Sequence, residues 1–352
     1  MAGIRVESSE HRRVSVQFCR EILPDVSRTF AISIRFLPGT LGRAVLDAYL
    51  LCRIADTIED DPAMGAERKV QLLDRFLECF DSAAAADEFP RTAAAVSGEN
   101  AHVRLVQNSD RVFQVYRGLP EGTRAIVRRW VEEMVVGMQK FVALYPHGIR
   151  IQTLSEYNNY CYYVAGTVGH LLTDLWHEHS RSVDDARYRA LLVHCEAFGE
   201  ALQTVNILKD IAWDAEHENS IYIPAQSLAD CGSSQQSLLN PHLLEKNLTA
   251  IRELVQLAWK DLDEALEYLL LIPKRAAPIR LFCILPLLFA YATLREITSS
   301  TAMLQPGGTV KIGRPEVKSL ILAGSTAVVS NNSVRWLIAH VRQEPFVLRW
   351  AA

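Results

Sequence analysis

Apolar residues recur along this chain mostly at intervals of three and four positions. The run ERKVQLLDRFLECF at residues 67–80 shows this pattern, which is typical of helices that bury one face. Alternating β-branched stretches between turn residues, which would indicate strands, are nearly absent from the sequence. Leu, Ala, Arg, Glu and Gln, all good helix formers, are abundant. The pattern therefore predicts an all-α protein.

Turn-forming residues interrupt the helical pattern at four places. They cluster at residues 82–100, 145–148, 230–241 and 304–309. None of these segments is long enough or rich enough in Gly and Ser to be a linker between domains. The first is rich in Ala and low in complexity, and we expect it to be a loose connection. Because no internal repeat of fixed period is found either, we expect a single helical domain.

The most apolar stretch of the sequence, LFCILPLLFAYATL at residues 281–294, lies between Arg280 and Arg295. A helix of this length rises only about 21 Å, whereas the hydrocarbon core of a bilayer is roughly 30 Å thick. We therefore expect a buried core helix and no transmembrane segment. The N-terminal residues 1–13 lack the apolar core of a secretory signal.

Composition and charge narrow the class of protein. Apolar residues make up 49% of the 352 residues and charged residues 22%, which is ordinary for a globular protein. The formal net charge of -4 provides no basic surface for nucleic acid. The seven cysteines include no CxxC pair, which favours reduced thiols over disulfides or a zinc site. We expect a cytoplasmic protein. Peripheral membrane contact is left open, and the oligomeric state is not encoded in these features.

A cluster of carboxylates, RIADTIEDD at residues 53–61, directly follows an apolar run. Four residues of a helix here, spaced by four, three and four, line one stripe that we call the first ladder: Tyr49, Arg53, Asp56 and Asp60. Like charges four positions apart destabilise a helix by a few tenths of a kcal/mol, so the Asp pair opposes the helix that it occupies. Glu59 and Asp61 add negative charge. Taken alone, a solvated helix end explains this cluster.

A second polar stripe occurs in ALQTVNILKDIAWD, residues 201–214. Its members, spaced by three, four and four, form the second ladder: Gln203, Asn206, Asp210 and Asp214. Like the first, it ends in an Asp pair four positions apart on an otherwise apolar helix. Two such pairs favour a metal site over two solvated surfaces, since facing carboxylates suit Mg²⁺ that shares phosphate oxygens. A metal-bridged diphosphate could approach carboxylates that would otherwise repel it.

Small residues and a tyrosine share the segment YNNYCYYVAGTVGHLL, residues 157–172. One helical face carries Tyr160, Val164, Thr167 and Leu171, and another carries Ala165, Gly166 and Gly169. Each Gly inside a helix costs about 1 kcal/mol relative to Ala. Close helix packing would compensate for this, and so would space for a long apolar ligand. Tyr160 offers a phenol that can donate or accept a proton in an apolar cavity.

A short cluster of hydrogen-bond donors begins the segment VSRTFAISIRFLP. It consists of Ser27, Arg28 and Thr29. Such a cluster is either a helix cap or a phosphate contact.

In their order and spacing, these motifs resemble the squalene/phytoene synthase family: SRTF, Y-x-x-x-R-x-x-DTIED, YCYYVAG and N-x-x-x-D-x-x-x-D. Later segments continue the resemblance, namely IYIP at 221–224, FCILPLL at 282–288 and VKIGRPEV at 310–317. The resemblance covers residues 20–320, with 1–19 as an N-terminal segment and 321–352 as a C-terminal helical tail. It implies the all-α isoprenoid synthase fold, with helices around a central apolar cavity.

The resemblance also implies roles for individual residues. Two Mg²⁺-bound prenyl diphosphates, farnesyl or geranylgeranyl, would be held through Asp56, Asp60, Asp210 and Asp214, with Asn206 helping. Substrate contacts would come from Ser27, Arg28, Thr29, Tyr49, Arg53, Gln203 and Lys209. Tyr160 would assist proton removal as a cyclopropyl intermediate closes. A squalene-type enzyme would then ionise this intermediate and quench it with hydride from NADPH.

Three departures from the family pattern concern the second ladder. Trp213 stands where Glu is expected, and Lys209 stands where Arg is common. Lys cannot reproduce the planar bidentate contact of Arg. The link AEHENSIYIP is one residue longer than usual, and no Arg or Lys lies between Asp210 and Pro224. If NADPH binds, we expect its positive partners to be Lys311 and Arg314 instead.

Three functions remain after these observations. The first is head-to-head condensation of two prenyl diphosphates to squalene, its presqualene intermediate or a phytoene-type product. The second, which the weakened second ladder favours, is transfer of one prenyl group to an aromatic acceptor, or cyclisation of a single chain. The third, a non-catalytic helical scaffold, is disfavoured by two complete ladders.

Overall fold

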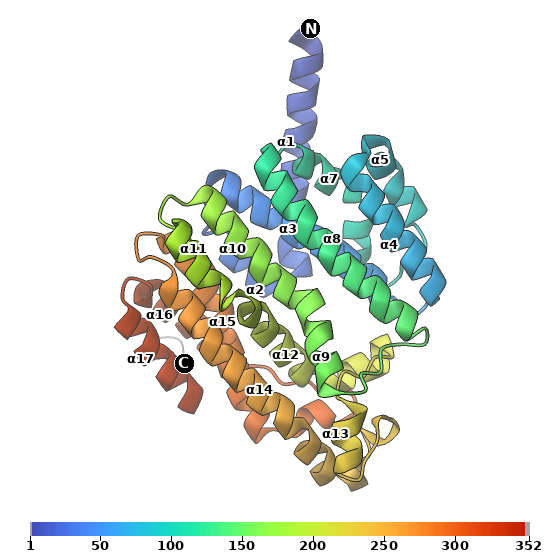
Figure 1. Ribbon diagram of the computed structural model, residues 1–352, viewed down its shortest axis with the longest axis vertical. Coiled ribbons are helices and arrows are strands. Elements are labelled where there is room, and N and C mark those ends of the chain that lie inside the picture. Colours follow the sequence, from blue (N-terminus) through green and yellow to red (C-terminus); the bar gives the residue numbers. More distant parts are fainter. Residues whose placement is uncertain (1, 349–352) are drawn as a thin grey trace. The chain divides into compact units, whose positions relative to one another are not determined.

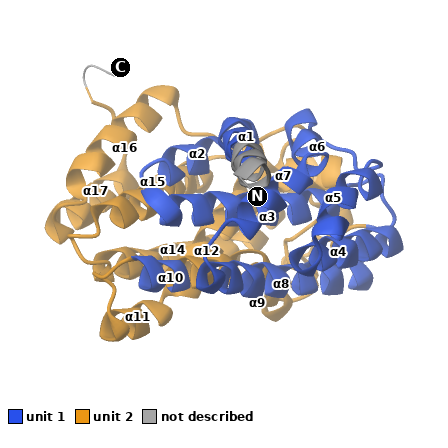
Figure 2. Ribbon diagram, turned by 90° about the horizontal axis from the view of Figure 1, so that it is seen from above, with its two compact units in different colours: residues 1–147, 174–179 blue, residues 148–173, 180–352 orange. Residues whose placement is uncertain are grey.

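The computed structural model describes residues 2–348, with side chains from residue 12 onward. The predicted all-α architecture is confirmed, because the only β pairing in this part of the chain is an isolated bridge between Arg150 and Ile221. The chain divides into two compact units, shown in Figure 2. Unit 1 comprises residues 1–147 and 174–179, and unit 2 comprises residues 148–173 and 180–352. The bounds of these units differ from the expected ones at residues 20 and 320. The expected bounds mark where the sequence resembles the family, whereas the units are defined by how compactly the chain packs.

Unit 1 is built from the N-terminal helices, which are labelled in Figure 1 except for α6, labelled in Figure 2. They are α1 (Ala2–Val26), α2 (Arg28–Ile34), α3 (Gly39–Glu59), α4 (Ala66–Asp81), α5 (Ala83–Thr92), α6 (Asn100–Val106), α7 (Ser109–Arg117) and α8 (Glu121–Leu144). The apolar helix α3 packs against α1, α4, α6, α7 and α8 and so forms the centre of the unit. Its burial positions the first ladder.

The Ala-rich segment of unit 1 is not the loose connection that we expected. It forms α5, and Ser82 caps this helix by accepting a hydrogen bond from the Ala85 amide at 3.1 Å. Phe89 of α5 is buried against the ring of Phe76, with ring centroids 5.8 Å apart. The expectation was wrong because Ala is the strongest helix former, and one buried aromatic side chain is enough to dock the helix.

Unit 2 contains the remaining helices, of which α10 crosses the division between the units. They are α9 (Leu154–Cys161), α10 (Thr167–His179), α11 (Asp185–Leu192), α12 (Cys195–Trp213), α13 (Ala225–Asp230), α14 (Leu244–Leu271), α15 (Ala277–Ser299), α16 (Arg314–Ala327) and α17 (Asn331–Gln343). Two π-helical turns interrupt the order, η1 (Tyr162–Gly166) and η2 (Asp214–Glu218), and single 3-10 turns lie at Gln235–Ser237, Pro241–Leu243 and Ala302–Leu304. Helix α12 packs against α14, α15 and η1, which places the second ladder on a well-supported element (Figure 1).

Helix α15 contains the most apolar stretch and is longer than we expected. It spans 23 residues, about 34 Å of helix, so the argument that it is too short to cross a bilayer was wrong. By length and composition alone it could cross a membrane, but 78% of its most apolar window is buried inside the protein. Arg280 and Arg295, expected to bound the apolar stretch, are both buried. Its burial supports the expected role as a core helix.

Candidate functional site

The first ladder lies along the C-terminal half of α3, as its spacing predicts. The Arg53 guanidinium donates to the Asp56 carboxylate, and its second terminal nitrogen donates to the Tyr49 hydroxyl at 3.3 Å. All three side chains are half-buried. Burial lowers the pKa of Arg53, but Tyr49 and Asp56 outweigh this and raise it above its ordinary value. The ladder is thus a connected polar row with a permanent cation inside it.

The acidic residues at the end of α3 divide into two kinds. Asp60 caps the helix, and its amide donates to the Asp56 carbonyl at 2.9 Å, so it continues the stripe. Asp61 is structural, because its carboxylate accepts from the Ser97 amide at 2.8 Å and the Ser97 hydroxyl at 2.6 Å. Glu59 is buried, and within the described part of the chain neither of its carboxyl oxygens has a hydrogen-bond partner. Burial, reinforced by Asp60 and Asp56, raises the pKa of Glu59 well above its ordinary value.

The donor cluster that begins with Ser27 adjoins the first ladder in unit 1. Ser27 is the N-cap of α2 and accepts a hydrogen bond from the Phe30 amide at 3.2 Å, which satisfies the cap interpretation. Arg28 is exposed at the first position of α2, and Thr29 is half-buried. The ring of Phe30 lies 5.2 Å from that of Tyr49, between centroids. The exposed guanidinium of Arg28 therefore stays available for a phosphate contact.

His102 on α6 belongs to the same region but was not found from the sequence. Helix α6 packs on α3. Burial and the positive charge of Arg53 lower the pKa of His102, while Glu99, Asp56 and the Val26 carbonyl act in the opposite direction. A lone histidine 46 residues beyond Asp56 carries no spacing signal, so only the packing of α6 on α3 could reveal it.

The second ladder lies on α12 in unit 2. Gln203 is half-buried and Asn206 is exposed. The helix leaves regular geometry at Asp210, where φ is -113° and ψ is 15°, and it continues from Asp214 as the π-turn η2. The spacing placed Gln203 and Asn206 on a regular helix, but it could not predict the irregular turn that carries Asp210 and Asp214.

The two aspartates of the second ladder have different surroundings. Asp210 accepts from the Lys209 ammonium at one carboxylate oxygen and from the Thr309 hydroxyl, at 2.8 Å, at the other. Burial and the neighbouring Asp210 raise the pKa of Asp214 to about 8, while Lys209 opposes the shift. Asp214 lines a small cavity that Ser220 and Tyr222 also line and that has no room for a water molecule.

Tyr160 lies in the last turn of α9 and is buried in unit 2. Its hydroxyl donates to the Tyr222 hydroxyl at 3.3 Å, and the two rings stack with centroids 5.0 Å apart and planes 29° from parallel. Since Tyr222 and Asp214 share the small cavity described above, a phenol pair lies next to the second ladder. The sequence singled out Tyr160 but not Tyr222, although the IYIP motif contains it.

Gly169, near Tyr160, serves helix packing, one of the two alternatives left open for the glycines. A Cβ atom on Gly169 would lie 1.8 Å from the Cys195 carbonyl oxygen. On Gly199 of α12 it would lie 1.9 Å from the Ala165 carbonyl oxygen. The backbones of α12 and of the η1–α10 segment therefore approach too closely for any side chain at these positions. Close packing of backbone accounts for Gly169, whereas a Cβ atom on Gly166 would meet side-chain atoms of Tyr162 and Glu200 at 3.1 and 3.2 Å.

The departures from the family pattern gather at the end of α12. Trp213 is 41% exposed and stacks on His217, with ring centroids 3.7 Å apart and planes 15° from parallel. The segment that carries Lys311 and Arg314 begins at the same place, because the Val310 amide donates to the Lys209 carbonyl at 3.3 Å. Both cationic side chains are exposed.

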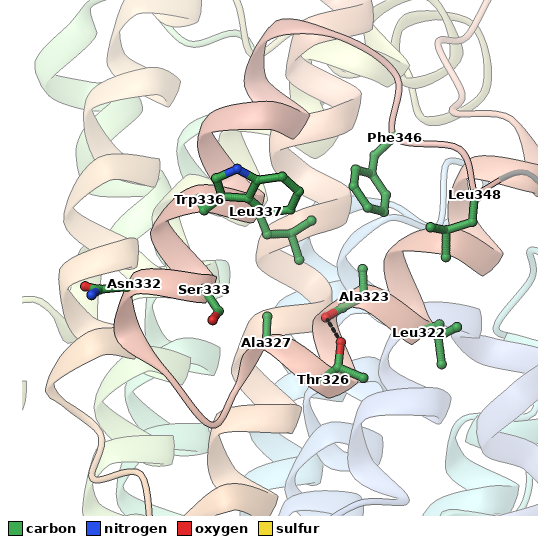
Figure 3. Close-up of a pocket in the computed structure, with 10 residues that line it drawn as sticks. All are labelled: Leu322, Ala323, Thr326, Ala327, Asn332, Ser333, Trp336, Leu337, Phe346 and Leu348. Atoms are coloured by element: carbon green, nitrogen blue, oxygen red, sulfur yellow. Dashed lines mark hydrogen bonds between the residues drawn. The ribbon is translucent and has the colours of Figure 1, made fainter.

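An apolar cavity elsewhere in unit 2 is not part of the candidate site. It has a volume of about 630 Å³ and lies between α16, α17 and the chain after α17 (Figure 3). Its walls include Leu322, Trp336 and Phe346, and no ladder residue lines it.

Each ladder provides a donor set that suits Mg²⁺ bound to a diphosphate. Among the described residues, no three His, Cys, Asp or Glu side chains are placed to hold one metal ion by themselves. Mg²⁺ does not need three, since it is commonly bound by one or two carboxylates and completes its shell with phosphate oxygens and water. Asp56 and Asp210 each accept from a side-chain cation in this structure. The residues therefore fit the group.

Known proteins resemble this chain over most of its length. A squalene synthase of Schizosaccharomyces pombe is 29% identical over 311 residues, which cover 88% of this chain and 65% of that protein. A lycopaoctaene synthase of Botryococcus braunii is 27% identical over 323 residues, covering 91% of this chain and 69% of that protein. The chain thus spans less than two thirds of the length of the first of these relatives.

The fold is shared with solved structures. The structure of TcSQS in complex with a ligand has a TM-score of 0.78 at 22% identity and covers 94% of this chain and 98% of that chain. A dehydrosqualene synthase in complex with a ligand has a TM-score of 0.58 at 18% identity, covering 95% of this chain and 98% of that chain. Since the squalene/phytoene synthase family model matches residues 23–316, most of the sequence and both ladders, this chain belongs to the squalene/phytoene synthase family.

Proposed function

We propose that this chain is a Mg²⁺-dependent prenyltransferase that condenses two prenyl diphosphates, of the farnesyl class, head to head and releases diphosphate. The observation that carries the proposal is the pair of aspartate ladders, each with a cation on its leading aspartate: Arg53 on Asp56 and Lys209 on Asp210. Squalene synthase and lycopaoctaene synthase, the relatives described above, support the head-to-head class.

In the proposed reaction, the ladder residues would bind metal and their neighbours would bind diphosphate. Asp56 and Asp60 would hold metal at the first ladder, and Asp210 and Asp214, helped by Asn206, would hold it at the second. Mg²⁺ would supply positive charge that neutralises the departing diphosphate. Further diphosphate contacts would come from Ser27, Arg28, Thr29, Tyr49, Arg53, Gln203 and Lys209.

The first chemical step would break the allylic C–O bond of one substrate, with the electron pair leaving on the diphosphate. The double bond of the second prenyl chain then attacks the allylic cation, and loss of a proton closes a cyclopropane ring. Tyr160 is proposed to assist this proton removal, because its hydroxyl is buried and held by Tyr222. Burial keeps bulk water from this region, which would otherwise trap the cation.

A second candidate function uses only one diphosphate, with transfer of its prenyl group to an aromatic acceptor or cyclisation. Trp213 favours it, because this residue replaces an expected carboxylate with an exposed aromatic stack on His217. NADPH belongs to the reductive form of the first candidate only. Lys311 and Arg314 are its proposed phosphate partners, since both are exposed next to the end of α12.

The test is product analysis with labelled farnesyl and geranylgeranyl diphosphate, each with and without Mg²⁺ and with and without NADPH. We expect Mg²⁺-dependent diphosphate release and a dimeric C30 or C40 product. Asp56→Asn and Asp210→Asn should each slow diphosphate release by about a hundredfold or more, because several kcal/mol of charge stabilisation is lost. The exposed carboxylates Asp25 and Asp230 provide matched Asp→Asn controls, one in each unit.

Three outcomes would redirect the proposal. Normal turnover by either ladder variant would show that its aspartate does not hold metal. An identical product profile with and without NADPH would exclude the reductive squalene reaction and leave presqualene- or phytoene-type coupling. A product that contains one prenyl unit would favour the second candidate.

A further inference from the structure

The segment between the 3-10 turn Ala302–Leu304 and α16 lies against the C-terminal end of α12, within unit 2. Two backbone amides attach it there. The Gly307 amide donates to a carboxylate oxygen of Glu216 at 2.9 Å, and the Val310 amide donates to the Lys209 carbonyl at 3.3 Å. Between these two attachments, the Thr309 hydroxyl donates to Oδ1 of Asp210 at 2.8 Å.

Features other than the Thr309 hydroxyl also fix the conformation of this segment. Gly307 has a φ of +66°, a left-handed conformation that favours glycine. A Cβ atom on Gly308 would lie 1.9 Å from the Ala302 carbonyl oxygen, so only glycine fits the turn. These two glycines, and the hydrogen bonds that the Gly307 and Val310 amides donate to the Glu216 carboxylate and the Lys209 carbonyl, hold the segment alongside the Thr309 side chain. The Thr309 hydroxyl can therefore act mainly on the orientation of the Asp210 carboxylate.

The Thr309 contact makes the two carboxylate oxygens of Asp210 different. Oδ1 accepts from a neutral hydroxyl, whereas Oδ2 accepts from the Lys209 ammonium. The backbone cannot fix this orientation by regular helix geometry, because Asp210 has non-helical φ and ψ. Metal-binding carboxylates are commonly oriented by a hydrogen bond from a neighbouring group, and loss of that bond weakens metal affinity.

We propose that Thr309 is a positioning residue for Asp210, holding Oδ1 so that Oδ2 stays directed at a cation. Without substrate that cation is Lys209, and with substrate it is the metal of a Mg²⁺-diphosphate. The inference rests on the proposed function, because it requires metal at the second ladder. Sequence motifs give no hint of it, since Thr309 lies 99 residues from Asp210.

The test compares Thr309→Val, which keeps the shape but removes the hydroxyl, with Thr309→Ser, which keeps the hydroxyl. Mn²⁺ binding in the presence of inorganic pyrophosphate is measured on the full chain by electron paramagnetic resonance. Asp56→Asn and Asp210→Asn assign each bound ion to its ladder. We expect Thr309→Val to lower the affinity for the Mn²⁺ ion assigned to Asp210 by about 10- to 100-fold. Thr309→Ser should bind this ion with the wild-type affinity.

Kinetics give a second readout that a purely structural role would not produce. The Mg²⁺ concentration for half-maximal activity should rise in Thr309→Val, while kcat returns towards the wild-type value at saturating Mg²⁺. The control is Thr301→Val, because the Thr301 hydroxyl lies in the same region and accepts from Gln305, at 3.2 Å, rather than binding a ladder residue. Circular dichroism and the thermal midpoint check that each variant is folded.

Unchanged or tighter Mn²⁺ binding in Thr309→Val would overturn the inference and leave the proposed function intact. If the wild-type protein binds no Mn²⁺ with pyrophosphate, the proposed function itself is wrong, and the inference falls with it.

Discussion

Asp47 shows how much a single residue of α3 departs from ordinary burial rules. Its side chain is 0% exposed, and neither carboxyl oxygen has a hydrogen-bond partner among the described residues. Burial raises its pKa well above the ordinary value of 3.8. Asp61, which is also buried, accepts hydrogen bonds from Ser97 and Ala63 instead. Burial therefore favours the neutral form of Asp47, which has no part in the first ladder.

The raised pKa of Asp47 predicts a pH-dependent stability. Above pH 3.8 the unfolded chain loses this proton while the folded protein keeps it, so stability falls as pH rises towards the folded pKa. The slope of this contribution is about 1.4 kcal/mol per pH unit. Asp47→Asn removes this pH-dependent contribution. The free energy of unfolding of the variant, measured with urea, should therefore rise relative to that of wild type between pH 5 and pH 8.

The control for Asp47 is Asp25→Asn, which makes the same change at an exposed carboxylate of unit 1. Its stability should follow that of wild type over the same pH range. Parallel curves for Asp47→Asn and wild type would mean that Asp47 has an ordinary pKa in the folded protein.

At the scale of elements, the position of α12 depends on its close approach to η1. Gly199 makes this approach because a Cβ atom there would lie 1.9 Å from the Ala165 carbonyl oxygen. The contacted atom is backbone, so it cannot move aside as a flexible side chain does. Since η1 directly follows α9, the helix that carries Tyr160, the same approach holds the catalytic tyrosine candidate in register with the second ladder.

We predict that Gly199→Ala destabilises the protein by about 1–3 kcal/mol, the usual cost of overpacking a well-packed core. The thermal midpoint measures this effect. The control is Gly122→Ala on α8, where the added Cβ would lie 3.0 Å from the end of the Glu178 side chain, which can move. Gly122→Ala should be neutral or stabilising, because Ala favours helix by about 1 kcal/mol over Gly. Equal effects of the two substitutions would refute the packing role of Gly199.

At the scale of the whole molecule, one buried arginine forms hydrogen bonds that connect the C-terminal helices of unit 2. Arg280 is 0% exposed, and its guanidinium donates to the carbonyls of Leu269, Ile272 and Val328 at 2.6–3.2 Å. It also donates to the Asn331 side chain at 2.9 Å. Burial lowers its pKa. The carbonyl groups at the end of α14 and after α16 thus share one donor on α15.

We predict that Arg280→Met destabilises the protein by about 3 kcal/mol or more, because several buried carbonyls lose their donor at a cost of roughly 1–3 kcal/mol each. Arg335→Met is the matched control, since Arg335 forms an exposed ion pair with Glu267, and such pairs contribute about 0–1 kcal/mol. Urea unfolding midpoints compare the two variants. A midpoint for Arg280→Met as high as that of Arg335→Met would show that the shared donor is not needed.

Local patterns in the sequence were enough to predict the helical class and both ladders. Residues three and four apart on a helix share a face whatever surrounds the helix, so the stripe from Tyr49 to Asp60 follows from spacing alone. In the second stripe this holds for Gln203 and Asn206, since the helix leaves regular geometry at Asp210. The same reasoning located Tyr160. It also left the use of the glycines open, because packing and ligand space place the same demand on a sequence.

Only the tertiary structure decided which distant groups meet these local motifs. Tyr222 lies 62 residues from Tyr160 and Thr309 lies 99 residues from Asp210, yet hydrogen bonds join both pairs. His102 reaches the first ladder through the packing of α6 on α3. Such contacts depend on how helices pack rather than on the period of any one helix. Sequence spacing therefore determined which residues line each ladder, and packing determined the partners that tune them.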